Sequence, residues 1–101
     1  MNRQMKQMME QAQKMQQGLV KLQGELAEAR IEGGAGPVKA TVNGSGELVG
    51  LAIGQEAVET GDAGMLEDMV LAAVRSAVEK SREYSSSRMR ELGLPDAGSF
   101  L

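Results

Sequence analysis

Nine basic side chains are gathered in two stretches of the sequence, one towards each end. Residues 1–24 carry four bases against one acid and residues 75–90 carry five bases against two acids, whereas residues 25–74 carry two bases against nine acids. Clustered Lys and Arg side chains bind phosphate groups, and an acidic centre would steer a polyanion towards the basic ends. The candidate phosphate-binding residues are Arg3, Lys6, Lys14, Lys21, Arg75, Lys80, Arg82, Arg88 and Arg90.

The same bases also fit a simpler interpretation. Lys and Arg residues opposite an apolar stripe usually form a solvated helix face. Arg75 is spaced for a local ion pair with Glu79, and Lys80 for one with Glu83. The net charge of −3 argues weakly against a nucleic-acid binder. The charge pattern alone leaves both interpretations open.

Catalytic chemistry has little support in the sequence. The 101 residues contain no Cys and no His, which excludes thiol nucleophiles, imidazole proton transfer and zinc sites built on these ligands. The glycine-rich run at residues 33–36 lacks the Lys-Ser/Thr pair of a phosphate loop, and no serine has an identifiable base beside it. We expect a protein that is not an enzyme and that uses no cofactor, metal or small-molecule substrate.

A long first helix is predicted to position the N-terminal bases. Its apolar residues are spaced alternately three and four apart, which is the heptad seam of a helix that packs against another helix. We predict this helix at about residues 2–29, and at about 1.5 Å per residue its roughly 40 Å length should leave one end projecting. The seam consists of Met5, Met8, Ala12, Met15, Leu19, Leu22, Leu26 and Ala29.

Three short strands are predicted at about residues 30–34, 37–43 and 47–53. Apolar and polar residues alternate in the second and third, and residues 43–46 read Asn-Gly-Ser-Gly, a turn sequence. A chain this short with only two aromatic residues builds a thin core, so we expect two copies to complete the burial as a homodimer. The predicted dimer interface is the apolar face of this hairpin: Val38, Ala40, Val42, Val49, Leu51 and Ile53.

A second long helix is predicted at about residues 63–92, with Asp62 as its N-cap. Its apolar stripe ends at Val78, because the positions that continue it are Ser81, Ser85 and Arg88, so we expect the last part of the helix to lie outside the core. Residues 93–101 read as a loose tail. The fold class is therefore α+β, in a single domain over residues 1–101. We find no membrane span or secretory signal and expect a cytoplasmic protein.

Three stretches together resemble one protein family. Residues 5–15 (MKQMMEQAQKM), 36–44 (GPVKATVNG) and 65–70 (MLEDMV) are similar, in order and spacing, to the YbaB/EbfC family of bacterial nucleoid-associated proteins. The resemblance implies a long helix, a small antiparallel sheet of about three strands and a second long helix. It also implies a sheet-mediated homodimer whose helices grip double-stranded DNA like tweezers, with low sequence selectivity and a nucleoid-organising or gene-regulatory role.

A rival interpretation assigns the function to the methionines. A Met-rich coiled-coil seam could hold apolar segments of other proteins, as an adaptor or a chaperone-like module without DNA binding does. The two interpretations differ in their response to salt, because phosphate binding weakens steeply as salt rises and apolar binding does not.

Overall fold

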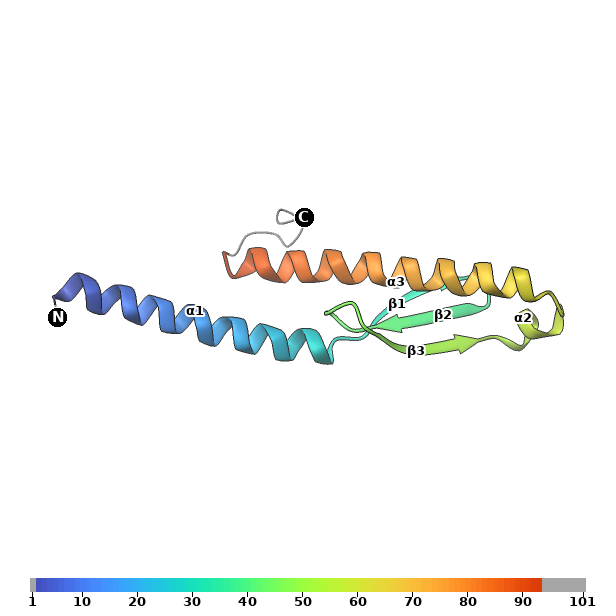
Figure 1. Ribbon diagram of the computed structural model, residues 1–101, viewed down its shortest axis with the longest axis horizontal. Coiled ribbons are helices and arrows are strands. Elements are labelled where there is room, and N and C mark those ends of the chain that lie inside the picture. Colours follow the sequence, from blue (N-terminus) through green and yellow to red (C-terminus); the bar gives the residue numbers. More distant parts are fainter. Residues whose placement is uncertain (1, 94–101) are drawn as a thin grey trace.

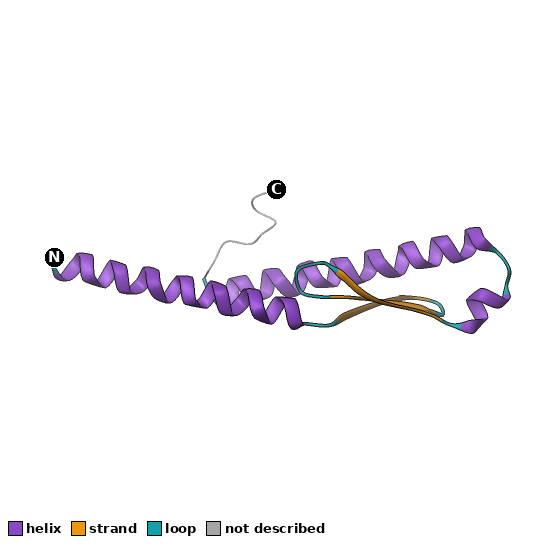
Figure 2. Cartoon of the chain, turned by 60° about the horizontal axis from the view of Figure 1, so that its bottom comes forward, coloured by secondary structure: helices purple, strands orange, loops and turns teal. Residues whose placement is uncertain are grey.

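A computed structural model describes residues 2–93 of the chain. The first helix, α1 (Arg3–Glu28), begins at Asn2, whose side-chain oxygen accepts a hydrogen bond of 2.8 Å from the amide of Met5. After α1, three strands and two further helices follow along an elongated molecule of 72 × 23 × 15 Å (Figure 1). The N-terminal half of α1 extends beyond every other element (Figures 1 and 2).

The strands β1 (Ile31–Ala35), β2 (Val38–Val42) and β3 (Leu48–Ile53) form one antiparallel sheet in the order β1-β2-β3. Val38 pairs with Ile53 and Ala40 with Leu51, so the apolar side chains of β2 and β3 share a face, as predicted. A register irregularity at Val42 brings Leu48 opposite it.

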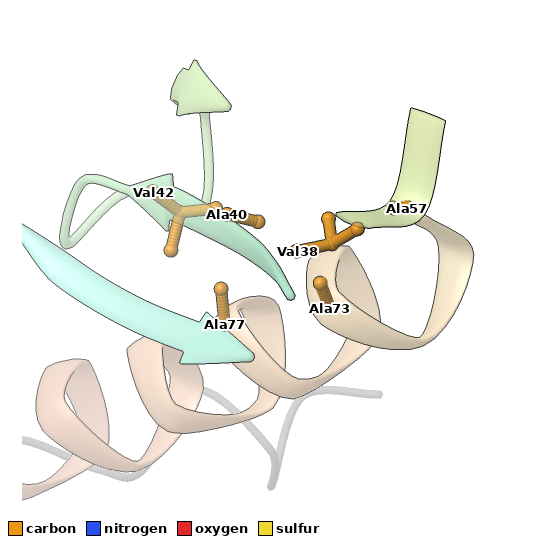
Figure 3. Close-up of a cluster of buried hydrophobic side chains, with 6 residues drawn as sticks. All are labelled: Val38, Ala40, Val42, Ala57, Ala73 and Ala77. Atoms are coloured by element: carbon orange, nitrogen blue, oxygen red, sulfur yellow. The ribbon is translucent and has the colours of Figure 1, made fainter. Parts of the chain in front are cut away.

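The last helix, α3 (Ala63–Glu91), covers β1 and β2 on this face and leaves β3 uncovered (Figure 1). Its N-cap is Asp62, as predicted, with the side chain 3.0 Å from the amide nitrogen of Met65. Small residues let the helix approach the sheet closely, because a Cβ atom on Gly33 would lie only 2.2 Å from the backbone nitrogen of Ala77. Figure 3 shows Ala77 and Ala73 of α3 pointing at the side chains of β2.

Two features of the core differ from the predictions. A short helix, α2 (Gln55–Glu59), was not expected, because five residues are too few to show a helical period; it buries Ala57 near Val38 (Figure 3). Ser81, expected to lie outside the core, is only 1% exposed. Its hydroxyl donates a 2.7 Å hydrogen bond to the carbonyl oxygen of Asn43. The buried face of α3 therefore continues past Val78, with a hydrogen-bonded polar residue in place of an apolar one.

The observed fold confirms the predicted architecture of a long helix, a three-stranded antiparallel sheet and a second long helix. The predicted tail lies, from residue 94 onwards, outside the described residues. Within residues 2–93, none of the helices is long and apolar enough to cross a membrane.

Candidate nucleic-acid interface

Three bases of α1 form a stripe along one exposed side of the helix. Arg3, Lys14 and Lys21 are 11 and 7 residues apart, close to three and two turns of a helix with 3.6 residues per turn. All three are exposed, as is Lys6 on an adjoining side of the helix. Among residues 2–93, no ion pair or side-chain hydrogen bond engages any of these four bases. We call Arg3, Lys14 and Lys21 the α1 basic stripe.

The five predicted bases of α3 fall into two groups. Arg75 and Lys80 lie on the part of α3 that covers the sheet, flanking the buried Ala77. The ammonium group of Lys80 donates a 3.3 Å hydrogen bond to the backbone carbonyl of Glu32 in β1. The charge pattern predicts residues 75–90 as a second projecting basic segment, and this is wrong for Arg75 and Lys80, because the sheet reaches further along α3 than the sequence indicated. Arg82 and Arg90 are exposed; Arg82 follows Ser81, whose hydroxyl contacts Asn43 just after β2, and it lies beside the β2–β3 turn.

Arg88 is held by acidic partners. Its guanidinium forms an ion pair with Glu25 of α1 and a second one, of 2.8 Å, with Glu91 one turn further along α3. The hydrogen bond to Glu25, and then the charge of Glu25, raise the pKa of Arg88 above its ordinary value. The positive charge of Arg88 is thus compensated inside the chain, which weakens it as a phosphate ligand.

The two predicted basic segments form one arm and not two. The Arg88–Glu25 ion pair joins α3 to α1, and Leu92 at the end of α3 comes close to Gly18, where an added Cβ atom would lie 3.9 Å from it. Among residues 2–93, the N-terminal part of α1 alone continues beyond this contact, as Figures 1 and 2 show. We call α1 together with the part of α3 beyond the sheet the arm.

The β2–β3 turn fixes the base of the arm. The side-chain oxygen of Asn43 accepts hydrogen bonds of 3.0 Å from the amides of Ser45 and Glu47, which closes the turn. The amide of Gly44 then donates a 2.7 Å hydrogen bond to the carbonyl oxygen of Leu26 in α1. The side chain of Leu26 is also buried, so the hydrogen bond and this burial together anchor the last turns of α1 to the sheet.

A second candidate surface is the uncovered part of the sheet. Val49, Leu51 and Ile53 of β3 are 46%, 45% and 39% exposed, although each is a large apolar residue. The other half of the predicted dimer interface needs correction. The side chains of Val38, Ala40 and Val42 are fully buried in the single chain, because α3 covers β2, so they are core residues with no surface left for a partner. Leu48, which was not predicted, adds a further exposed apolar side chain.

Comparison with known proteins identifies the family. The family model described as "YbaB/EbfC DNA-binding family" matches residues 1–95. The chain belongs to the YbaB/EbfC family. A nucleoid-associated protein of Saccharopolyspora erythraea is 51% identical over 87 residues, which are 84% of this chain and 75% of that protein. A nucleoid-associated protein of Pelotomaculum thermopropionicum is 43% identical over 90 residues, 87% of this chain and 86% of that protein.

The YbaB/EbfC fold also occurs in a solved structure. The crystal structure of an uncharacterized protein from Helicobacter pylori is similar with a TM-score of 0.71, covering 91% of this chain and 97% of that one. At 20% sequence identity this similarity concerns the fold alone. The family therefore supplies a DNA-binding context for the arm, while the contact residues must be argued from the arm itself.

The sequence did not reveal which of the nine bases are engaged by partners within the chain and which are left available for phosphate. Glu25 and Arg88 are 63 residues apart, so only the packing of α3 beside α1 brings them together. The available signal was that Arg88 falls in line with the buried stripe of α3, which places it on the side of the helix that faces the rest of the chain.

Proposed function

We propose that this chain binds double-stranded DNA as a homodimer, through phosphate contacts of the arm and with low sequence selectivity. The α1 basic stripe is the observation that carries the proposal. Its three side chains are exposed, lack acidic partners among the described residues and face the same way along a helix. Exposed Lys and Arg side chains in such a row suit contacts with a phosphate backbone, and such contacts carry no sequence information.

The charge distribution supports the same proposal. The bases of the stripe stand on the arm, whereas the sheet, α2 and the start of α3 carry a run of acidic residues: Glu32, Glu47, Glu56, Glu59, Asp62, Glu67 and Asp68. A duplex would be repelled by that acidic part and attracted to the arm. Arg82 and Arg90 extend the basic surface of the arm onto α3.

The homodimer is supported by the uncovered part of the sheet. β3 is an edge strand with one row of backbone groups unpaired by other strands and with large apolar side chains exposed. A second copy placed against the same strand would cover both, in a symmetric contact. The proposed dimer interface is accordingly Leu48, Val49, Leu51 and Ile53, and the dimer carries two arms.

A salt titration tests the proposal. Binding of a labelled random-sequence duplex is measured at several salt concentrations for the unmodified chain and for the triple variant Arg3→Ala, Lys14→Ala, Lys21→Ala. If the dimer neutralises about four to eight phosphates, log affinity falls against log salt with a slope of about −4 to −7. The triple variant should bind all duplexes more weakly and with a flatter slope. Lys39→Ala, which removes an exposed base of β2 outside the arm, is the matched control and should leave the slope unchanged.

Two results would contradict the proposal: no retention of the duplex at low salt, or binding that the triple variant leaves unchanged. Binding that persists at high salt and is lost on Met5→Ser, Met8→Ser would instead favour the adaptor or chaperone-like alternative. That alternative draws on one observation, since Met5 and Met8 are 54% and 68% exposed. In the cell, the proposed activity places the protein on the nucleoid, in DNA organisation or gene regulation.

A further inference from the structure

The heptad seam of α1 is used over only part of its length. Leu22 and Leu26, near the C-terminal end of the helix, are 3% and 7% exposed. Met8 and Met15, on the same side of the helix, are 68% and 47% exposed. The seam thus continues without change of spacing from a buried part to an uncovered part. We call the uncovered part, residues 5–19, the open seam.

The open seam is a surface of its own, separate from the α1 basic stripe. A shallow groove runs along it, lined by Met8, Ala12, Met15 and Leu19 together with the glutamines beside them. Positions seven residues apart drift by only about 20° around a straight helix, so the seam keeps to one side over its whole length. The basic stripe lies on the other side of α1, which leaves both surfaces accessible at the same time.

The residues that flank the open seam carry no charge. In the heptad numbering that places Met5 at position a, positions e and g between residues 4 and 23 are glutamine, methionine or glycine. Arg3, Lys6, Glu10, Lys14 and Lys21 all occupy the outward positions b, c and f. In paired helices the e and g positions decide which partner is accepted, because charges there attract or repel one another.

From this pattern we propose that the open seam binds the open seam of a second copy of this chain. Two identical helices present the same apolar side chains at the same spacing, so the seam side chains of each helix can pack between those of the other. Uncharged flanks remove the like-charge repulsion that would otherwise oppose the pairing of identical helices. Charged flanks would favour a partner of opposite charge, and the uncharged flanks of the open seam carry no such preference. The contact is separate from the one proposed at β3.

Cysteine cross-linking tests the pairing directly, because the chain has no cysteine of its own. Ala12 is the middle residue of the open seam and is exposed, so Ala12→Cys should leave the fold intact. A disulfide needs Cα atoms about 4.4–6.8 Å apart, which a residue at the centre of a paired seam can meet. We expect Ala12→Cys to form disulfide-linked dimers at least about tenfold faster than Gln17→Cys, the matched control at an outward position of the same helix. Equal rates for the two variants, or a free thiol in both, would overturn the proposal.

Methionine oxidation provides a second measurement on the unmodified protein. In the single chain Met8 is more exposed than Met65 of α3, at 68% against 48%. Peroxide should therefore oxidise Met8 faster if the open seam is uncovered in solution. Pairing predicts the reverse order at micromolar protein, and a return to faster oxidation of Met8 in Ala12→Lys, which places a charge in the seam. If Met8 is the faster of the two in the unmodified protein, the seam is not paired.

Discussion

The backbone amide of Gly44 donates a 2.7 Å hydrogen bond to the carbonyl oxygen of Leu26, and the two residues belong to the turn of the sheet and to the arm. The contact requires glycine, since a Cβ atom at residue 44 would lie 2.8 Å from Cδ2 and 2.9 Å from Cα of Leu26. The direction of α1 relative to the sheet is therefore set by a backbone contact that no side chain can enter.

Gly44→Ala should consequently destabilise the protein, because α1 or the turn must shift to admit the methyl group. We expect a loss of about 1–3 kcal/mol in the free energy of unfolding, measured by urea denaturation. Gly24→Ala is the control, since no atom lies within 4 Å of its added Cβ, and it should raise stability by up to about 1 kcal/mol through helix propensity. Equal effects of the two substitutions would contradict the anchoring role of Gly44.

Gly33→Ala should be more damaging still. The added Cβ would lie 2.2 Å from the backbone nitrogen of Ala77 and 2.7 Å from the carbonyl oxygen of Ala73, so the whole of α3 would have to move off the sheet. We expect a loss above about 3 kcal/mol, seen as a lower urea midpoint or as failure to fold. The neighbouring Gly34→Ala meets its nearest atom only at 3.6 Å and should be tolerated far better.

Arg88→Ala separates the structural bases from the phosphate-binding bases. Because Glu25 and Glu91 already compensate its charge, the substitution should leave the salt dependence of DNA binding nearly unchanged. Lys14→Ala, in contrast, should flatten the slope by about 0.9 for each phosphate contact that is lost. Both slopes come from the same duplex titration, and a larger effect of Arg88→Ala than of Lys14→Ala would reverse our assignment.

Leu51→Asp tests the proposed dimer without requiring the chain to unfold. Leu51 is 45% exposed in the single chain, so an aspartate there stays hydrated until a second copy covers it. We expect sedimentation equilibrium to show a folded monomer for Leu51→Asp and a dimer for Val20→Asp, which places the same charge on an exposed residue of α1. A chain that is monomeric before any substitution would refute the dimer.

Local patterns were sufficient to predict most of the fold. The three-and-four spacing predicted α1, the alternation around residues 43–46 predicted the hairpin, and Asp62 predicted the start of α3, because each of these signals lies within a few neighbouring residues. The extent of packing was not predictable in the same way. How far the sheet reaches along α3 decides that Lys80 contacts β1, and this depends on contacts between distant parts of the chain.

The candidate site shows the same division. The distribution of charges along the sequence was enough to find the two groups of bases. Which acids pair with them depends on how distant segments pack together, as the ion pair of Arg88 with Glu25 shows. The predicted interface failed at Val38, Ala40 and Val42 for a related reason. Alternation shows that two strands share an apolar face, but it does not show how many strands of that face a helix covers. Here α3 covers β2 and leaves β3 exposed.

In the single chain α1 is held near Gly18 and beyond, so the part of the helix before Gly18 would act as a lever wherever no second copy covers it. Arg3 lies 15 residues from that pivot, about 22 Å along the axis at 1.5 Å per residue, so a swing of about 10° moves it by about 4 Å. The same swing moves Lys14 by only about 1 Å, and Lys21 lies on the fixed side. Under the proposed DNA binding, one helix would thus combine a fixed contact at its base with an adjustable contact at its tip, and the same arm could follow duplexes of different curvature.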